Sequence, residues 1–417
     1  MTADMHIINR RAIEALRSGV PNRYAVEALG CQQPTIQERF LAQLRATNEG
    51  LSSEEQSTGL LVVGDFGTGK SHLLEHLNHI ALDQNFVCSK LVISKETPLH
   101  DPVKLYRSAA SVAVAPMKCG SAFTELAWKL DTNAEAFARL EGWVTSMGAR
   151  LNSRFAASLL LFKKGDEEMV QRMISFWSGE PLGGGDVRRD LRACGERPYR
   201  IEKARVKDLA IQRFLFAPRL MIAAGYAGWV LFIDEVELIG RYSPLQRAKS
   251  YVELARLFGR LGEQQFPGLT TVFAIMSNFE AEVLEEKNDL EDLPAKVRDK
   301  GLDELAKHAQ VGMRILRKEK VGLSAPDADT ISRTRDEVRA IYAQAYGWEP
   351  QKYEEERTLA STVMREHVRT WINEWDLKRL YPEYSPATEV HQLTSGYAED
   401  ADLEGASGDG SEHPAPT

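Results

Sequence analysis

The sequence predicts an α/β protein in which a parallel sheet is flanked by helices, and two observations support this fold class. Four short apolar runs, at residues 60–63, 86–93, 230–233 and 271–276, have the length and composition of strands buried on both faces. Segments with the apolar spacing of helices separate these runs. Strands that alternate with helices are typical of a parallel sheet covered on both sides.

The chain is expected to divide into four parts. These are an N-terminal helical segment (1–50), an α/β core (51–325), a helical lid (326–384) and an acidic, disordered tail (385–417). Within the core, residues 98–225 are expected to form a large, mostly helical insertion, because turn signals such as Pro116 separate its helical stretches. A polar linker is expected at 48–58, directly before the first strand.

The charge of the chain is unevenly distributed. Its 417 residues contain 52 Lys and Arg against 60 Asp and Glu, and the formal net charge is −8. The excess acid lies in residues 383–417, which contain no Lys or Arg, so residues 1–382 are neutral. The net charge therefore does not argue against a nucleic-acid partner.

Several classes of protein are excluded by composition. No apolar run reaches the roughly 18–20 residues of a membrane helix, and the first residues lack the apolar stretch of a signal peptide. The cysteines, which are Cys31, Cys88, Cys119 and Cys194, form no C-x-x-C pair and predict neither a zinc site nor a disulfide framework. We therefore expect a cytoplasmic protein without a membrane partner.

A Gly-rich segment between the first predicted strand and a helix at 70–83 matches the phosphate-binding pattern G-x-x-x-x-G-K-[ST], the P-loop. Its residues, with the one that follows, are Gly64, Asp65, Phe66, Gly67, Thr68, Gly69, Lys70, Ser71 and His72. Glycines let backbone amides approach a phosphate closely, and the start of the helix adds partial positive charge. We expect Lys70 to contact the β- and γ-phosphates of ATP and Ser71 to ligate Mg²⁺.

Two further apolar runs end in polar residues at the edge of the sheet where ligands bind. After the run 230–233, Asp234 is expected to hold Mg²⁺ through its water shell, and Glu235 to orient or deprotonate the attacking water. A Glu in this position favours hydrolysis over passive nucleotide binding. After the run 271–276, Asn278 is expected beside the γ-phosphate, with Ser277 as the alternative, and a simple strand-end cap remains open.

These three elements, in this order, resemble an AAA+ P-loop ATPase of the initiator-like type (ORC/Cdc6 and STAND-related). Two other segments resemble a narrower group, the BREX-system ATP-binding family of phage-defence loci (BrxD-like). They are residues 13–23, which include Gly19-Val20-Pro21-Asn22, and residues 98–106, which begin Pro98-Leu99-His100-Asp101-Pro102. The resemblance runs from about residue 7 to about residue 382.

The resemblance implies an ATP-hydrolysing core, a helical lid, and a homo-oligomer in which an arginine from a neighbouring subunit completes the active site. It also implies work on DNA or on other BREX proteins, among which a helicase is the expected neighbour. Arg365, early in a lid helix, is the expected γ-phosphate sensor, and Arg369 one turn later is the alternative.

Two weaker assignments also follow from the resemblance. Arg298, which follows the apolar run 271–276, is the expected arginine finger, and Arg260 is the alternative. Pro21 and Asn22 are expected to touch adenine, because initiator-like ATPases use the segment before the core for this contact. The metal-like spacing of His72, His76 and His79 is not expected to bind a metal, because no carboxylate or Cys completes the set.

A basic segment leaves the choice of partner open. Residues 188–219 contain ten basic and four acidic residues, which could contact the phosphates of double-stranded DNA by counterion release. A solvated helical face or a subunit contact explains the same charges. The leading function is therefore an ATPase in phage defence. The alternative is a nucleotide-gated assembly module with little turnover that recruits a helicase or another effector.

Overall fold

A five-stranded parallel sheet forms the centre of the protein. The computed structural model describes residues 2–19, 24, 26, 29–116, 121–197, 200–262, 264–324, 326–351 and 364–383. The strands are β1 (Leu60–Val63), β2 (Val87–Val92), β3 (Trp229–Asp234), β4 (Leu269–Ile275) and β5 (Lys320–Gly322), and their order across the sheet is β2-β3-β4-β1-β5. The expected tail at 385–417 lies outside the described residues.

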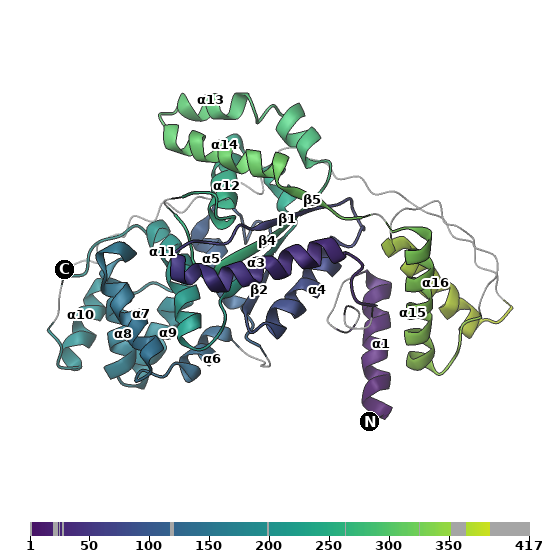
Figure 1. Ribbon diagram of the computed structural model, residues 1–417, viewed down its shortest axis with the longest axis horizontal. Helices are drawn as coiled ribbons and strands as arrows, with labels where there is room; N and C mark the ends of the chain where they lie inside the picture. Colours follow the sequence, from purple (N-terminus) through teal and green to yellow (C-terminus); the bar gives the residue numbers. More distant parts are fainter. Residues whose placement is uncertain are drawn as a thin grey trace.

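Helices surround this sheet (Figure 1). In chain order they are α1 (Thr2–Ser18), α3 (Pro34–Ser53), α4 (Lys70–Asp83), α5 (Pro102–Ser111), α6 (Ala122–Lys129), α7 (Glu135–Thr145), η1 (Met147–Ala149), α8 (Ser153–Lys164), α9 (Glu167–Trp177), α10 (Gly184–Ala193), α11 (Val206–Ala223), η2 (Val236–Arg241), α12 (Pro244–Leu257), η3 (Glu280–Glu286), α13 (Asp292–Arg298), α14 (Asp303–Lys318), α15 (Ala328–Tyr346) and α16 (Met364–Leu380). All four strands expected from the apolar runs are present.

The sheet is covered on both faces, as the apolar runs predict. Successive side chains of a strand point to opposite faces, and every residue of β3 is buried. Val230 and Phe232 pack in one apolar cluster with residues of α3 and α4. Leu231 and Ile233 pack in the other cluster, with residues of α5, α11 and α12. The parallel α/β architecture expected from the sequence is therefore confirmed.

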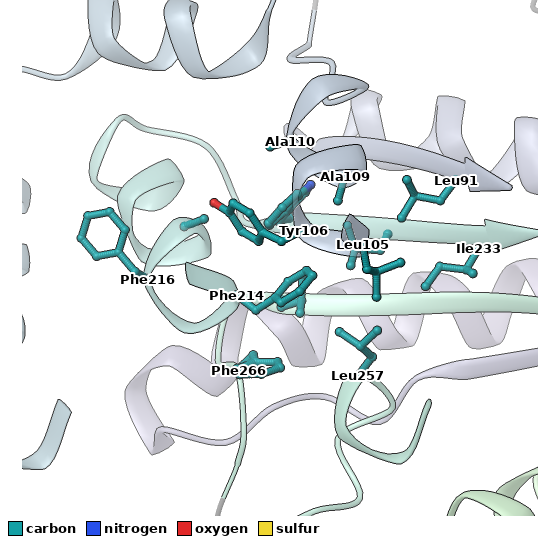
Figure 2. Close-up of a cluster of buried hydrophobic side chains, with 14 of the residues drawn as sticks. Leu91, Leu105, Tyr106, Ala109, Ala110, Phe214, Phe216, Ile233, Leu257 and Phe266 are labelled. Carbon is teal, nitrogen blue, oxygen red and sulfur yellow. The ribbon is translucent and has the colours of Figure 1, made fainter. Parts of the chain in front are cut away.

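The insertion joins the second cluster through aromatic side chains (Figure 2). The Tyr106 ring on α5 meets the Phe214 ring on α11 edge to face at 5.0 Å, and it meets Trp229 of β3 at 5.9 Å. Its hydroxyl donates a hydrogen bond to the carbonyl oxygen of Trp177 at 2.6 Å. The helices α6 to α10 therefore extend a core that is continuous with the sheet, and Figure 1 shows them at the opposite end of the molecule from α1, α15 and α16.

Two local expectations are wrong. The polar linker expected at 48–58 is helical as far as Ser53, because α3 continues until Glu54 takes a left-handed conformation, with φ of 57°. The Glu54 amide closes this last turn by donating a hydrogen bond to the carbonyl oxygen of Gly50. The short strand β5 was not expected, because its three residues are partly or fully exposed and carry no apolar run.

The first helix packs on α15 and α16, the helices of the expected lid, rather than on the sheet. Apolar residues of α1, including Ala12 and Ile13, form a separate cluster with α15 and α16. By contrast, Phe40 of α3 packs in the cluster beneath the sheet, with its ring 5.9 Å from the Phe232 ring. The N-terminal helical segment thus contributes to two different bodies, which we call the core and the α1–lid body (α1, α15 and α16).

Gly312 allows α14 to cross α12 closely. A Cβ added at Gly312 would lie 2.0 Å from the carbonyl oxygen of Tyr251. We expect Gly312→Ala to lower the free energy of unfolding by about 1–3 kcal/mol, measured by urea denaturation, because the helices must move apart. Gly142→Ala in α7 is the control, since its added Cβ meets nothing within 4 Å. Equal urea midpoints for the two variants would contradict the close crossing.

Candidate nucleotide site

The Gly-rich loop between β1 and α4 is a tight turn. The backbone amide and the hydroxyl of Thr68 both donate to the carbonyl oxygen of Asp65, at 3.3 and 2.8 Å. Gly67 and Gly69 have φ of 77° and 101°, a region in which residues with a Cβ are strained. A Cβ on Gly64 would lie 2.6 Å from the Thr68 hydroxyl. The glycines are therefore required by the backbone of the loop itself.

Lys70 lies folded into this loop. Its ammonium group donates to the carbonyl oxygens of Gly64 and Asp65 at 2.8 and 3.0 Å, and it lies 3.1 Å from the sulfur of Met276. Burial lowers the pKa of Lys70, while the nearby carboxylates of Glu237 and Asp234 act in the opposite direction. A phosphate entering the loop would give this partly desolvated cation a full counter-charge.

A hydrogen bond joins Ser71, at the start of α4, to Asp234, at the end of β3. The Ser71 hydroxyl donates to the Asp234 carboxylate at 2.6 Å, and the other oxygen of that carboxylate accepts from the Glu235 amide at 2.9 Å. Hydroxyl and carboxylate oxygens suit Mg²⁺, which usually takes few protein ligands and keeps waters and phosphate oxygens. No group of three His, Cys, Asp or Glu suited to a metal occurs among the described residues. The Ser71–Asp234 pair therefore fits a magnesium ion shared with a phosphate.

Glu235 follows Asp234 in a strained conformation. Its φ of 57° lies in the left-handed region, where a non-glycine residue costs about 1–3 kcal/mol. This turn ends β3 and directs the Glu235 side chain to the wall of a cavity. Partial burial and the adjacent Asp234 carboxylate raise the pKa of Glu235. A raised pKa is favourable for a group that accepts a proton near neutral pH.

The cavity has a volume of about 410 Å³ and lies between the core and the α1–lid body. Its polar end contains Lys70, Ser71, Asp234, Glu235 and Glu237. Its apolar part is lined by Ala15, Leu16, Leu29, Leu323, Met364 and Val368. A cavity whose wall contains both charged and apolar side chains suits an amphipathic ligand such as a nucleotide.

Arg365 reaches this cavity from α16. Its guanidinium group lies over the Phe66 ring, 5.3 Å from the ring centre, and its side chain packs against Gly19. Arg369, the alternative, is exposed and does not line the cavity. Of the two, Arg365 is therefore the arginine in position to contact a bound phosphate.

Asn278 and Ser277 lie differently from the expectation. The strand that precedes them, β4, does lie between β1 and β3. However, Asn278 donates to the Glu282 carboxylate at 2.6 Å and is not part of the cavity wall, while the Ser277 hydroxyl donates to the carboxylate of Asp65. Met276 is the residue of this segment that lines the cavity. A γ-phosphate contact by Asn278 remains a prediction that requires its side chain to turn.

The other expected site residues are dispersed. Arg298 is exposed at the end of α13, outside the cavity wall, and Arg260 forms an ion pair with Glu319 at 2.6 Å. Pro21 and Asn22 lie outside the described residues, although Gly19 and Leu29 on either side of them line the cavity.

The three histidines of α4 each have a different partner. His72 lies 2.7 Å from the carbonyl oxygen of Gly30, and burial lowers its pKa. His76 lies 3.1 Å from the side-chain oxygen of Gln37, and His79 lies 3.3 Å from the Glu75 carboxylate. A carboxylate, Glu75, therefore does lie beside one of these histidines, although no carboxylate is expected from the sequence to complete the set.

The basic segment is less basic at the surface than its composition indicates. Arg213 and Arg219 are buried; Arg213 donates to the carbonyl oxygen of Phe176, and Arg219 lies over the Trp143 ring at 4.1 Å. Arg189 and Arg205 form ion pairs with acidic residues of the same segment or its flank. The exposed basic residues that remain extend from α10 to the start of α11 and include Arg188, Arg192, Arg197, Arg200, Lys203 and Lys207.

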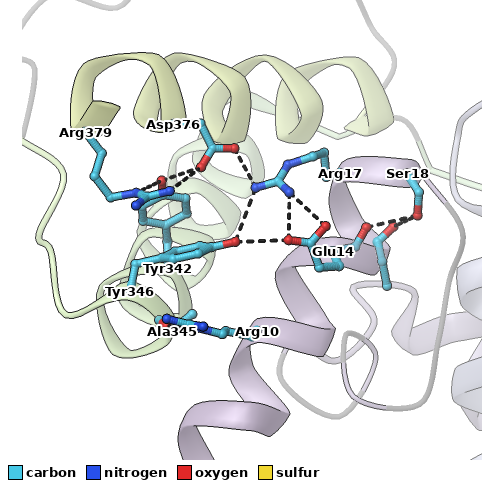
Figure 3. A network of polar contacts seen from close by, with 10 residues as sticks. Arg10, Glu14, Arg17, Ser18, Tyr342, Ala345, Tyr346, Asp376 and Arg379 are labelled. Atoms are coloured by element: carbon cyan, nitrogen blue, oxygen red, sulfur yellow. Dashed lines mark hydrogen bonds and ion pairs between the residues drawn. The ribbon is translucent and has the colours of Figure 1, made fainter. Parts of the chain in front are cut away.

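A polar network fixes α1 to the lid helices (Figure 3). Arg17 of α1 donates to the carboxylate of Asp376 on α16 at 2.5 Å and to Glu14 at 2.7 Å. The Tyr342 hydroxyl on α15 donates to the same Asp376 at 2.7 Å. The network holds α1 on α15 and α16, and in this way Leu16 reaches the cavity.

Two segments of the chain connect the core to the α1–lid body, and they lie next to each other. Gln33, just before α3, donates to the carbonyl oxygen of Ser324 at 3.1 Å and accepts from the Ser324 amide at 3.0 Å. Both residues line the cavity. No pattern in the sequence indicates this pairing, because the two residues are almost 300 positions apart.

Lys70 lies within a Gly-rich loop, and the Ser71–Asp234 pair lies beside it at the edge of a parallel sheet. These two features define a P-loop nucleotide-binding protein. Comparison with protein families agrees with this class: the description "BREX system ATP-binding protein BrxC/D" matches residues 7–130 and 132–379. The chain belongs to this family of ATP-binding proteins of BREX phage defence, which confirms the resemblance found in the sequence. No curated protein and no solved structure matched the chain. None of the described helices is long and apolar enough to cross a membrane.

Proposed function

We propose that the protein is an AAA+-type ATPase of cytoplasmic BREX phage defence that binds and hydrolyses ATP. One observation carries the proposal: Lys70, Ser71, Asp234 and Glu235 meet at the polar end of one cavity. These are the groups needed to bind phosphates, to hold a magnesium ion and to activate a water molecule. The apolar part of the cavity accepts the base and the ribose.

In this proposal each residue has one task. Lys70 leaves the carbonyl oxygens of its own loop and binds the β- and γ-phosphates. Ser71 and Asp234 hold Mg²⁺, which neutralises charge that develops on the phosphate oxygens. Glu235 accepts a proton from the attacking water, and Arg365 moves from the Phe66 ring to the γ-phosphate. Asn278 is the proposed sensor on β4.

Oligomerisation is the second part of the proposal. Arg298 is exposed and lies outside the cavity of its own chain, as an arginine that acts on a neighbouring subunit must be. We propose that ATP holds a homo-oligomer together in this way, and that turnover is coupled to double-stranded DNA or to another BREX protein such as a helicase. The initiator-like subtype remains part of the proposal.

The test is the steady-state rate of ATP hydrolysis by the purified protein, with and without double-stranded DNA. A rate that rises with DNA and disappears in the Glu235→Gln variant supports a DNA-coupled ATPase. ATP binding with no turnover under either condition would contradict hydrolysis. It would favour the alternative, an assembly module that is gated by nucleotide.

The basic surface of α10 is the proposed DNA contact. We expect the combined variant Arg188→Glu, Arg189→Glu and Arg192→Glu to weaken DNA binding and to reduce the slope of log K against log salt by about 0.9 for each phosphate that the protein no longer neutralises. Fluorescence anisotropy at several salt concentrations measures this slope. The control is charge reversal at Lys300 and Lys307 (Lys→Glu), two exposed residues near and on α14. An unchanged slope in the α10 variant would exclude this surface.

A further inference from the structure

Glu237 is an acidic residue of the cavity to which the proposed function gives no role. It lies on η2, two residues after Glu235, and lines the same cavity. One oxygen of its carboxylate is buried and has no hydrogen-bond partner among the described residues. A buried acceptor without a donor destabilises the folded protein, and more so when it is charged, so such an atom in a native protein calls for an explanation.

The nearest cation does not supply the missing donor. Glu237 and Lys70 line the same cavity, and the charge of the Glu237 carboxylate acts to raise the pKa of Lys70, against the effect of burial. A lysine has three protons to donate. Those of Lys70 are directed at Gly64, Asp65 and Met276. The donor for the Glu237 oxygen must therefore come from outside these residues, and a water molecule in the cavity is the simplest candidate.

This water would lie close to the reacting phosphate. Lys70 is the group that contacts the γ-phosphate in the proposed function, and Glu235 lines the same end of the cavity as Glu237. A water bonded to Glu237 would therefore lie in the cavity whose wall also contains Lys70 and Glu235. Two acceptors fix both protons of a water and aim its lone pair, which is the effect of orientation on a bimolecular step.

We propose that Glu237 is a second acidic residue of the hydrolysis reaction, which accepts a hydrogen bond from the attacking water and orients it for Glu235. The inference rests on the proposed ATPase function. In the step, the water oxygen forms a bond to the γ-phosphorus while the bond from the γ-phosphorus to the bridging oxygen of ADP breaks. One water proton passes to Glu235, and the other stays on the phosphate product, hydrogen-bonded to Glu237.

Kinetics of two substitutions test this role. We expect Glu237→Ala to lower kcat about tenfold or more, with the Kd for ATP and Mg²⁺ within about twofold of the parent. Glu237→Gln keeps one acceptor oxygen, so it should recover part of the lost rate. Glu285→Ala, an exposed acid on η3, is the control and should hydrolyse ATP at the parental rate. A parental kcat in Glu237→Ala, or a loss of ATP affinity as large as the loss of rate, would overturn the proposal.

A second measurement does not depend on turnover. ADP with aluminium fluoride imitates the phosphate together with the attacking water, whereas ADP with beryllium fluoride imitates bound ATP. We expect Glu237→Ala to weaken the aluminium fluoride complex about tenfold relative to the beryllium fluoride complex, in line with the loss of kcat. An unchanged ratio would overturn the role of Glu237 even if the parent proved to be a slow ATPase. If Glu235→Gln hydrolysed ATP at the parental rate, Glu235 would not be the general base. The ratio of the two complexes would then still decide the role of Glu237.

Discussion

Replacing Lys70 by Ala should nearly abolish ATP binding, and this is the largest effect that we expect from a single substitution. Lys70 is the cation of the loop, and it is partly desolvated before the phosphate arrives. Charge-assisted hydrogen bonds contribute about 1.5–3 kcal/mol each, so losing two of them weakens binding roughly 100-fold or more. Titration of a fluorescent ATP analogue measures the Kd.

The fold of the Lys70→Ala variant should persist. The substitution removes a buried charge whose hydrogen bonds lie within its own loop, apart from the approach to the Met276 sulfur just beyond β4. Lys307→Ala, at an exposed position of α14, is the control for the removal of a lysine. If Lys70→Ala bound ATP with parental affinity while keeping its circular dichroism spectrum, the assignment of the phosphate loop would be wrong.

Glu235→Gln should separate binding from hydrolysis. The amide keeps the shape of the side chain and cannot accept a proton, so kcat should fall about 10²–10⁴-fold while the Kd for ATP stays close to the parental value. Any assembly that requires ATP should then accumulate, and size-exclusion chromatography with ATP can detect it. A parental rate in this variant would remove Glu235 from the mechanism.

The pH dependence provides an independent check on Glu235. A general base acts in its deprotonated form, and the pKa of Glu235 is raised above the ordinary value for Glu. The parental kcat should therefore fall with decreasing pH at a higher pH than an ordinary Glu would cause. The residual rate of Glu235→Gln should lack this dependence, because its amide does not titrate in that range.

The parts of the site that follow one another in sequence could be predicted. Gly64 to Ser71 obey a local rule of backbone geometry, and an apolar run that ends in Asp234 places a carboxylate at a known edge of the sheet. Asn278 was chosen by the same rule, yet its side chain turns to Glu282, one helical turn away. The end of a strand determines where the backbone of a residue lies, but it does not determine which neighbouring group the side chain contacts.

The parts of the site that depend on distant contacts could not be predicted. The cavity wall formed by α1 depends on the Arg17–Asp376 ion pair, whose residues are more than 350 positions apart. β5 has three residues and little burial, so neither length nor hydrophobicity distinguishes it from a loop. Glu237 is visible in the sequence close to Asp234 and Glu235, but only its orphaned oxygen and its place in the cavity wall distinguish it from a surface acid.

The Gln33–Ser324 pair ties together the two chain segments that connect the core to the α1–lid body. Two connections far apart would allow the α1–lid body to rotate only about the line between them. Two connections joined at one point allow it to rotate in more than one direction. The nucleotide cavity lies at this pivot. From there α1 extends 17 residues, or about 25 Å at 1.5 Å per residue. A rotation of the body at the cavity would move the far end of α1 further than it moves the groups around the phosphates. A neighbouring molecule in contact with that end would therefore respond to the state of the nucleotide.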